Sequence, residues 1–344
     1  MGSTHTQERV TIVDVAKALL FGWKFVHRPG PNFLGKVVLI TGGSRGLGLA
    51  LAEEFALQGG RIVLCARDEP ELEQARQRLA ERGADVLAIP CDMTQREQVR
   101  QLVDQATEHF GRIDILVNNA GIITVGPIEA QTLDDYEDSM RIMYWGAIYA
   151  TMAVVPQMLE RKQGRIVNIC SIGGKVGVPH LLPYTCAKFA LTGFSEGLYA
   201  ELKRKGIHVI TAIPGLMRTG SPVNAIFKGK HHAEFTWFDL ADSLPLLSMS
   251  AQKAARSIVQ ATRKNKAEIT LTFPAKLLAR FHGLFPGTTM KIMSITDRLL
   301  PREGKAEGLD RWKGRESETS LSQSFVTSLG QRATQEYNQN VSRT

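Results

Sequence analysis

The chain has 344 residues, of which 43% are hydrophobic and 22% are charged. This ordinary globular composition excludes a wholly disordered or collagen-like chain, and the length suffices for one large domain. The 42 Lys and Arg residues exceed the 34 Asp and Glu residues, which gives a formal net charge of +8. The basic excess lies near the two ends, in 1–36 and 253–298, where it alternates with apolar residues and forms no nucleic-acid recognition motif. We therefore expect no nucleic-acid partner.

The four cysteines, Cys65, Cys91, Cys170 and Cys186, are scattered and form no C-x-x-C pair. This pattern indicates reduced thiols in a cytoplasmic enzyme, with no disulfide framework and no metal site. Charged residues interrupt the N-terminal apolar stretch, so we expect no signal peptide. No run of 18 uncharged apolar residues occurs, so we expect no membrane-spanning helix.

Short apolar runs alternate with longer amphipathic stretches from residue 36 onward. The first run, Val37-Val38-Leu39-Ile40, is continuous and rich in β-branched residues, as in a strand buried on both faces. Because parallel strands require crossover helices, the alternation predicts an α/β fold of Rossmann type: a doubly wound, seven-stranded, mostly parallel sheet with helices on both faces. The predicted strands are 37–40, 61–66, 86–90, 113–117, 165–169, 208–213 and 269–272, and the predicted helices include 49–58, 69–82, 95–110, 132–162 and 184–205.

The predicted domain organisation places a Rossmann-type domain at 34–272, with additions at both ends. Residues 1–33 form an amphipathic N-terminal extension, since 10–26 bring apolar side chains to one helical face. Residues 273–300 give two short amphipathic helices. Residues 301–344 are polar and poor in large apolar groups, so we expect a mostly disordered tail.

A glycine-rich turn follows the first strand and opens the first helix. A bare backbone at such a turn lets a pyrophosphate approach, and the helix N-terminus offers free N–H groups and a positive dipole end to the phosphate charge. The position of the turn between strand and helix makes the pattern more specific than a glycine motif alone. The candidate cofactor-binding residues here are Thr41, Gly42, Ser44, Arg45, Gly46, Leu47 and Gly48.

The end of the second strand predicts which dinucleotide is bound. An acid at this position favours a free ribose 2′-hydroxyl, whereas an arginine favours a 2′-phosphate. Ala66 stands where the acid is expected, and Arg67 follows it. Arg45 offers a second positive charge, so we predict NADP(H). The alternative is that both arginines are ordinary solvated surface residues.

Tyr184 and Lys188 are spaced i and i+4 on a predicted helix, so they share one face. A phenol near pKa 10 is a poor acid–base group at pH 7, but a nearby ammonium favours the phenolate and lowers its pKa. Ser171 follows an apolar strand, at the edge where ligands of open α/β sheets bind. We predict these three residues as the catalytic set.

These motifs, in this order, closely resemble the short-chain dehydrogenase/reductase family over roughly residues 34–272. The resemblance implies that Tyr184 is the general acid–base, that Lys188 lowers its pKa and holds the nicotinamide ribose, and that Ser171 orients a carbonyl. It also implies dimers or tetramers assembled through the helices at 132–162 and 184–205. Further implied cofactor contacts are Asp92 and Met93, then Asn118, Ala120 and Gly121, and finally Pro214, Gly215, Met217 and Thr219.

One residue departs from the family pattern. The helix before Ser171 normally carries an asparagine three residues ahead of a glycine, which supports a water relay to the lysine. Here Met143 stands three residues ahead of Gly146. The resemblance therefore leaves two readings: an NADPH-dependent reductase, reversible as an alcohol dehydrogenase, or a catalytically weak NADPH-binding protein that acts through partners.

The segment 220–250 lies where the family places its substrate lid, and it is rich in aromatic and leucine residues. Either these side chains line an apolar pocket for a lipophilic carbonyl substrate, or they pack the lid against the core. His180, Leu181 and Leu182 are candidates for the same pocket mouth. For the neighbouring pair His231-His232, no nearby acid or cysteine completes a metal site, so we expect a surface loop.

The basic amphipathic helices at 273–300 leave two alternatives open. Such helices can lie in a membrane interface, which predicts a cytoplasmic protein attached peripherally to a membrane surface. Alternatively, they cover the sheet or the substrate cleft.

Overall fold

The computed structural model describes residues 33–244, 248–302, 309–319 and 327–339. All of them belong to one compact unit. The predicted extension at 1–33 lies outside the described residues except for Phe33, and so do Leu246 and Leu247 of the predicted lid.

A seven-stranded sheet forms the centre of this unit, and every strand in it runs parallel to its neighbours. The prediction of seven strands is confirmed, and the sheet is parallel throughout. The strand order β11-β7-β6-β4-β1-β2-β3 reverses direction at β1, which is the doubly wound arrangement. The strands are β1 (Val37–Thr41), β2 (Arg61–Ala66), β3 (Val86–Pro90), β4 (Ile115–Asn118), β6 (Gly164–Ile169), β7 (Ile207–Ile213) and β11 (Glu268–Thr270).

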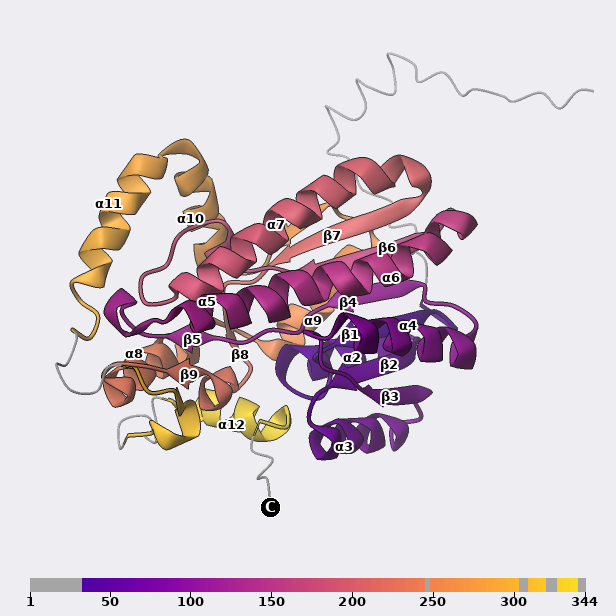
Figure 1. The fold of residues 1–344 in the computed structure, drawn as a ribbon, viewed down its shortest axis with the longest axis horizontal. Helices are drawn as coiled ribbons and strands as arrows, with labels where there is room; N and C mark the ends of the chain where they lie inside the picture. Colours follow the sequence, from indigo (N-terminus) through magenta and orange to yellow (C-terminus); the bar gives the residue numbers. More distant parts are fainter. Residues whose placement is uncertain (1–32, 245–247, 303–308, 320–326, 340–344) are drawn as a thin grey trace, which may run out of the picture. The chain divides into compact units, whose positions relative to one another are not determined.

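Alternate residues of each strand point into two separate cores. Val38 and Ile40 of β1 pack with helices α2 (Gly46–Leu57), α3 (Glu69–Ala80) and α9 (Ala251–Arg263). Val37 and Leu39 pack on the opposite face with helices α4 (Arg96–Phe110) and α6 (Gly146–Arg161). Since both faces of the strands are buried, the continuous apolar runs in the sequence follow directly from the fold. Figure 1 shows α6 and the long helix α7 (Leu182–Leu202) side by side over one face.

The stretch predicted as one helix at 132–162 is divided in the structure. It consists of α5 (Leu133–Ser139), a π-helical turn (Met140–Trp145) and α6. Within the described residues, Leu133–Arg161 is the one stretch long and apolar enough to cross a membrane, with a mean hydropathy of 1.3 in its most apolar window. Its inner face, including Val154 and Met158, lies in the core beside α4. We therefore describe it as a core helix of the sheet.

The predicted lid region at 220–250 and the residues just before it form small elements beyond the carboxyl edge of the sheet. They include β8 (Leu216–Arg218), β9 (Ile226–Phe227), α8 (His231–Ser243) and β10 (Ser248–Ser250). Three of its aromatic residues, Phe227, Phe235 and Phe238, are buried against one another with Val125 and Ala225. For these three, packing within the lid is the correct reading.

Two helices follow the last strand of the sheet. They are α10 (Phe273–Leu284) and α11 (Pro286–Asp297), and they pack against each other as a hairpin. Only Ala275 of α10 and Thr289 of α11 are buried. Figure 1 shows α11 standing away from the sheet.

The prediction of a mostly disordered tail is wrong for the part of it that the structure describes. Strand β12 (Trp312–Lys313) pairs with β9 in a three-stranded sheet with β5 (Thr124–Val125). Helix α12 (Ser328–Glu336) follows it, and Ala333 and Tyr337 are buried in the main core. Few apolar residues suffice here, because these two lie one helical turn apart and enter the same core.

Candidate active site

The glycine turn between β1 and α2 is held too tightly for larger residues. A Cβ at Gly48 would lie 2.1 Å from the carbonyl oxygen of Gly42. Gly42 and Gly46 adopt positive φ angles of +63° and +56°, which favour glycine. Glycines at these positions are therefore required by the backbone path itself.

Asn119 and Thr41 hold this turn against β4. The Asn119 side-chain amide donates to the carbonyl oxygens of Thr41 and Gly42, both at 3.0 Å. The Thr41 hydroxyl accepts from the backbone N–H groups of Asn119 and Ala120, again at 3.0 Å each. The predicted nucleotide residues Thr41, Gly42 and Ala120 thus meet at one point, at the switch in strand order.

The start of α2 fits the pyrophosphate of a dinucleotide. Arg45 precedes the helix in an extended conformation and its side chain forms no capping hydrogen bond. The amides of Gly46, Leu47 and Gly48 begin the helix, where backbone N–H groups have no partner within the helix. In addition, Gly46 has no side chain, and a Cβ there would lie 2.8 Å from the Gln339 side-chain nitrogen and 3.9 Å from the Thr219 Cβ. Both features suit the close approach of an anionic group.

Glu71 is a site residue that the sequence analysis missed. It is buried in the first turn of α3, where it accepts hydrogen bonds from the Ser44 hydroxyl and, at 3.0 Å, from Arg45 Nη1. Arg45, predicted to bind a cofactor phosphate, is therefore in an ion pair with Glu71. Arg67 is exposed, and no ion pair involves it among the described residues. The sequence signal that could have pointed to Glu71 is its place in the first turn of α3, three residues after Asp68, which caps that helix.

Ser171 lies directly after β6. Its hydroxyl oxygen accepts from the backbone N–H of Gly173 at 3.0 Å. A Cβ at Gly173 would lie 3.3 Å from the Tyr184 ring, and one at Gly174 would lie 2.6 Å from the carbonyl oxygen of Lys188. These two glycines let the Ser171 loop pack closely against α7.

Lys188 and Tyr184 lie on α7 facing that loop, as predicted. The Lys188 ammonium is buried and donates to the carbonyl oxygen of Ile169 at 2.7 Å, and it lies 5.6 Å from the centre of the Tyr184 ring. Burial lowers the pKa of Lys188 to about 8. Burial also raises the pKa of Tyr184 to about 12, although a hydrogen bond with Ser171 opposes this. The predicted lowering of the phenol pKa is therefore not found: desolvation outweighs the favourable contacts.

A chain of buried polar side chains crosses the sheet below the site. Asn118 donates to the Asn168 side-chain oxygen at 2.8 Å and to the Thr151 hydroxyl at 3.1 Å. Asn168 donates in turn to Ser195 at 2.9 Å, and Ser195 shares a 2.7 Å hydrogen bond with Thr211. The chain joins β4, β6, β7, α6 and α7. Asn118 therefore braces the sheet, and its partners were not predicted.

Met143 lies in the π-helical turn between α5 and α6 and is 1% exposed. Its Cγ and Sδ atoms would lie 3.3 Å from a Cβ at Gly121. Single π-helical turns in longer helices occur frequently at functional sites. The side chain thus fills the space beside the Asn118–Gly121 turn with an apolar thioether.

The remaining predicted cofactor residues occupy the ends of β3 and β7. The Asp92 carboxylate accepts from Thr94 N–H at 2.9 Å, and Met93 is buried beside Cys65. Pro214 accepts from Ile172 N–H at 2.8 Å, which links the end of β7 to the Ser171 loop. Gly215 packs against Thr272, Met217 donates its N–H to Asp242 at 3.0 Å, and Thr219 is buried.

His180 connects the loop before Tyr184 to two other segments. Its Nδ1 atom lies 2.8 Å from Glu234 of α8, and its Nε2 atom lies 3.6 Å from Asp297 of α11. His231 and His232, by contrast, contact Ser317, and the described residues contain no cluster that could hold a metal ion.

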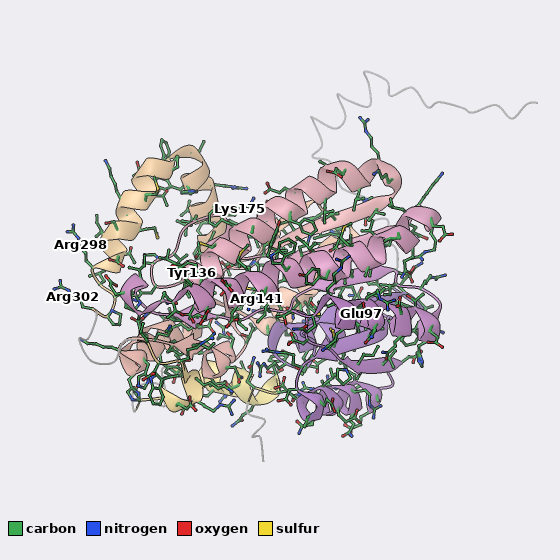
Figure 2. All side chains as sticks on the ribbon, in the orientation of Figure 1. Glu97, Tyr136, Arg141, Lys175, Arg298 and Arg302 are labelled. Carbon is green, nitrogen blue, oxygen red and sulfur yellow. The ribbon has the colours of Figure 1, made fainter. Side chains whose placement is uncertain are left out.

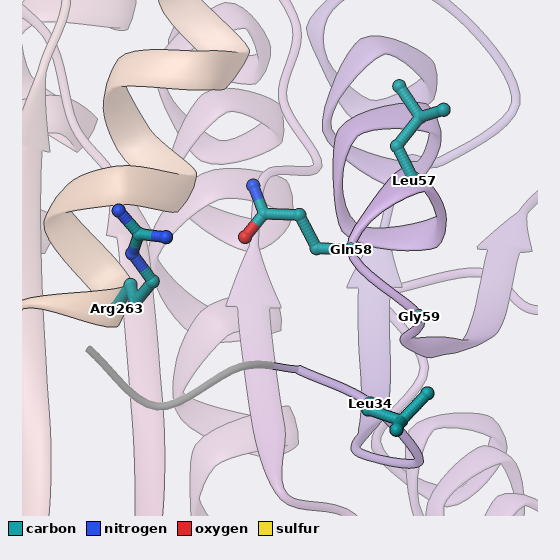
Figure 3. A pocket seen from close by; sticks show the side chains of 5 residues that line it. All are labelled: Leu34, Leu57, Gln58, Gly59 and Arg263. Carbon is teal, nitrogen blue, oxygen red and sulfur yellow. The ribbon is translucent and has the colours of Figure 1, made fainter. Parts of the chain in front are cut away.

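An open hollow of about 520 Å³ lies elsewhere, lined by Leu34, Leu57, Gln58, Gly59 and Arg263 (Figure 3). It adjoins the turn between α2 and β2, at the amino-terminal edge of the sheet. The candidate catalytic residues lie at the carboxyl edge, where ligands of such sheets bind. The hollow is therefore separate from the site.

The arrangement can move a proton beside a dinucleotide site. A bound nicotinamide cofactor supplies hydride transfer. The Tyr184 phenol can carry the proton, Ser171 next to it can orient a carbonyl oxygen, and the Lys188 ammonium places a positive charge 5.6 Å from the centre of the phenol ring. Positioning and charge stabilisation are thus the contributions of these three side chains.

Known proteins share both this sequence and this architecture. The family model for short chain dehydrogenases matches residues 36–226. A dehydrogenase/reductase SDR family protein 7-like from Anopheles gambiae is 36% identical over 71% of this chain and 77% of its own length. A fatty acyl-CoA reductase from Acinetobacter baylyi is 31% identical over 80% of this chain and 89% of its own length. The solved structure of a gluconate 5-dehydrogenase from Burkholderia cenocepacia, in complex with NADP and tartrate, is 28% identical with a TM-score of 0.61, covering 71% of this chain and 97% of that one.

The family model spans more than half of the chain, and the catalytic set lies at the carboxyl edge of a doubly wound parallel sheet. The chain therefore belongs to the short-chain dehydrogenase/reductase family.

Proposed function

We propose that this oxidoreductase uses NADPH to reduce a lipophilic carbonyl compound to an alcohol, in a reaction that is reversible. The observation that carries the proposal is the meeting of Ser171, Tyr184 and Lys188 beside the glycine turn of β1 and α2. Tyr184 acts as the acid–base group, Ser171 orients the carbonyl, and Lys188 stabilises charge on the phenol.

The ionisation of Tyr184 favours the reductive direction. With a pKa raised to about 12 by burial, the phenol is protonated at neutral pH. Carbonyl reduction needs a proton donor at this position, whereas alcohol oxidation needs a base. Lys188, with a pKa lowered to about 8, still carries its proton at pH 7 and can hold the charge that develops on the phenol.

Preference for NADP(H) is supported by Arg67 and Arg45 near the end of β2 and in the glycine turn. Arg67 is exposed and has no acidic partner among the described residues, so its guanidinium is available to a 2′-phosphate. The gluconate 5-dehydrogenase of similar fold is described in complex with NADP. Ala66, at the end of β2, provides no carboxylate to bind a free 2′-hydroxyl.

A lipophilic substrate is supported by the apolar lid. Three partly buried apolar side chains pack on the aromatic cluster of the lid: Ile123, Leu181 and Trp237. Leu181 follows His180 in the sequence, and Trp237 donates to Glu234, which also contacts His180. One relative is named a fatty acyl-CoA reductase. Apolar side chains with a few polar groups are typical of pockets for such ligands.

The experiment measures NADPH oxidation with aliphatic, steroid-like and fatty-acyl ketones, with NADH as the second coenzyme. Tyr184→Phe removes the proton donor and should lower kcat by about 100-fold or more. Tyr199→Phe on the same helix is the matched control, because the Tyr199 hydroxyl accepts from the exposed Lys203 and the ring, which packs on the core, is kept by phenylalanine. Equal activity in Tyr184→Phe and the wild type would refute the mechanism.

Met143 favours a second candidate function, that of a catalytically weak NADPH-binding protein acting through partners. A buried thioether offers no amide to a water relay behind Lys188. Turnover that is negligible in the wild type but restored in Met143→Asn would favour this candidate. An unchanged rate would show that the residue has no part in a relay.

We also propose assembly into dimers or tetramers through α6 and α7. Large apolar side chains are exposed along this face: Trp145 is 44% exposed, Met152 61% and Phe189 42%. Light scattering on the purified protein tests this, since a monomer at micromolar concentration would contradict it.

A further inference from the structure

The α10–α11 hairpin presents large apolar side chains to its surroundings. Phe273 is 77% exposed, Leu284 74% and Leu299, just after α11, 83%. Soluble monomers rarely expose a contiguous apolar surface of this kind without a binding role. We call this the hairpin surface, and its apolar members are Phe273, Leu277, Leu284, Phe285, Met290, Ile292, Ile295 and Leu299.

Basic residues are interleaved with these apolar side chains. Residues 273–302 contain five Lys and Arg residues and one acid, Asp297. Arg298 and Arg302 point away from the rest of the molecule beyond the end of α11 (Figure 2). The five basic residues are Lys276, Arg280, Lys291, Arg298 and Arg302, of which all are exposed.

The one acid, Asp297, is 57% exposed and lies 3.6 Å from His180, four residues before Tyr184 in the loop that leads into α7. The hairpin surface therefore carries five positive charges against one negative charge, and this contact joins it to the loop before α7. Thr289 and Ala275, the buried residues of the hairpin, are small and contribute to the inner side.

We propose that the hairpin surface docks on a membrane containing anionic phospholipid. Apolar side chains enter the interface while lysines and arginines pair with lipid phosphates, which is the chemistry of interfacial amphipathic helices. A second copy of this chain fits less well, because a two-fold interface would bring the same five positive charges face to face. The excess of basic residues thus favours an anionic membrane over a second copy of this chain as the partner of the hairpin surface.

Flotation with vesicles tests the proposal on the full-length protein. Vesicles of phosphatidylcholine with one-third phosphatidylglycerol should retain the protein at low salt, and pure phosphatidylcholine should retain at least tenfold less. Leu277→Ser/Leu284→Ser/Leu299→Ser should lower retention at least tenfold. Leu57→Ser, at a residue 74% exposed at the far end of α2, is the matched control and should bind as the wild type.

A charge variant separates the two contributions. Arg280→Gln/Lys291→Gln/Arg298→Gln should lose the preference for anionic vesicles, while Arg100→Gln on α4 should keep it. Failure of the wild type to float, or equal flotation of the hairpin variants, would overturn the proposal. So would light scattering that shows the apolar triple variant losing a dimer that the wild type forms. None of these readouts depends on catalysis.

A different observation concerns the C-terminal residues 337–339, which we call the tail tip. The backbone N–H of Gly46, at the start of α2, donates to the carbonyl oxygen of Tyr337 at 3.0 Å. Asn338 donates its side-chain amide to the carbonyl oxygen of Ser44 at 3.3 Å. Gln339 donates to the carbonyl oxygen of Thr219 at 3.0 Å.

The tail tip therefore lies over the backbone groups that suit a pyrophosphate. A Cβ at Gly46 would lie 2.8 Å from the Gln339 side-chain nitrogen, so the bare face of Gly46 is in contact with the tail. Tyr337 is 3% exposed and anchors the segment in the core, and Asn224 donates to the Gln339 side chain at 2.6 Å. A carbonyl oxygen and a phosphate oxygen cannot both accept the same in-line Gly46 N–H.

We infer that the tail tip and a dinucleotide compete for the start of α2, so that the C-terminus restrains coenzyme binding. This second inference rests on the proposed dinucleotide-dependent function. Release of residues 337–339 frees the Gly46 amide and uncovers Thr219. The competing group belongs to the same chain, so it is present at a fixed effective concentration whatever the protein concentration.

The test titrates NADPH against the full chain, against a chain ending at Glu336, and against Asn338→Ala/Gln339→Ala, which keeps the buried Tyr337. Both altered proteins should bind NADPH at least fivefold more tightly, by calorimetry or nicotinamide fluorescence. Gln335→Ala, exposed on α12, is the control and should bind as the wild type. Equal or weaker binding in both altered proteins would overturn the inference alone. Absence of NADPH binding in every protein would overturn the proposed function as well.

Discussion

Replacing Glu71 by glutamine is expected to raise the preference for NADPH over NADH. Glu71 holds Arg45 through an Nη1–Oε2 contact of 3.0 Å, with the carboxylate side 6% exposed and the arginine side 42% exposed. Glutamine keeps an acceptor for the Ser44 hydroxyl but removes the negative charge. Arg45 is then free to turn toward a 2′-phosphate.

The size of the effect follows from two opposing contributions. A half-exposed ion pair such as Arg45–Glu71 is worth about 0.5–1 kcal/mol. A hydrogen bond between a guanidinium and a phosphate is worth about 1.5–3 kcal/mol. In the wild type Arg45 must give up the ion pair before it can bind the phosphate, whereas in the variant it need not, so the gain equals the energy of the pair and the ratio of kcat/KM for NADPH to that for NADH should rise by about two- to fivefold.

This ratio is measured from initial rates with NADPH and with NADH, using the same series of ketone concentrations for both coenzymes. Glu73→Gln is the matched control, because Glu73 lies on the same helix but pairs with Arg76 at 2.7 Å on the surface. A ratio that stays constant or falls would refute the reasoning. A rise that comes wholly from poorer use of NADH would also refute it, since Glu71 would then serve the adenosine ribose rather than restrain Arg45.

Three further predictions concern stability. The side chains of Lys228 and Asp135 form an ion pair that is fully buried, so Lys228→Met leaves a buried carboxylate without this partner. The free energy of unfolding, measured in urea, should fall by about 3–5 kcal/mol. Lys230→Met, at an exposed lysine, is the control and should leave it unchanged. Gly48→Ala should cost about 3 kcal/mol or more, because its Cβ would lie 2.1 Å from the Gly42 carbonyl oxygen, and circular dichroism melting checks this. Burial, together with the charge of Asp239, raises the pKa of Asp242 to about 8, so the folded state binds more protons than the unfolded state and stability should fall as the pH rises from about 4 to 8. Asp242→Asn should flatten that fall in urea titrations at pH 5, 7 and 8.5, and an unchanged slope would contradict the assignment.

The sheet, and the common face of Tyr184 and Lys188 on one helix, could be predicted because their signals are local. A strand buried on both faces requires a continuous apolar run, and β1, β2 and β7 show it directly. The i, i+4 spacing of Tyr184 and Lys188 fixes their common face on α7 without any knowledge of the fold. The glycine turn is similarly constrained, since its backbone excludes a Cβ at Gly48.

Features that depend on partners distant in sequence could not be predicted. Glu71 reads as an ordinary acid in the first turn of a helix, and only the fold brings it to Ser44 and Arg45. The tail reads as disordered because its composition is polar on average. Its position depends instead on two buried residues, Ala333 and Tyr337, whose core includes strands β1 and β2, more than 260 residues earlier in the chain.

The lid helix α8 is the element that the two terminal additions share. Its residue Glu234 holds His180, which also contacts Asp297 of the hairpin. At its other end, Ser243 lies next to Gly330 of α12, since a Cβ at that glycine would be 2.7 Å from the serine hydroxyl.

A lid tied at both ends cannot shift without changing a tertiary contact to one of the two additions. The Lys228–Asp135 pair fixes the strand before α8 to α5, so the lid has a third attachment in the interior. Phe227, Phe235 and Phe238 of the predicted lid pack against one another, and the polar contacts join the lid to its neighbouring segments. The predicted lid is therefore attached to segments that lie outside the Rossmann-type domain in sequence, and we expect its movement to depend on these contacts.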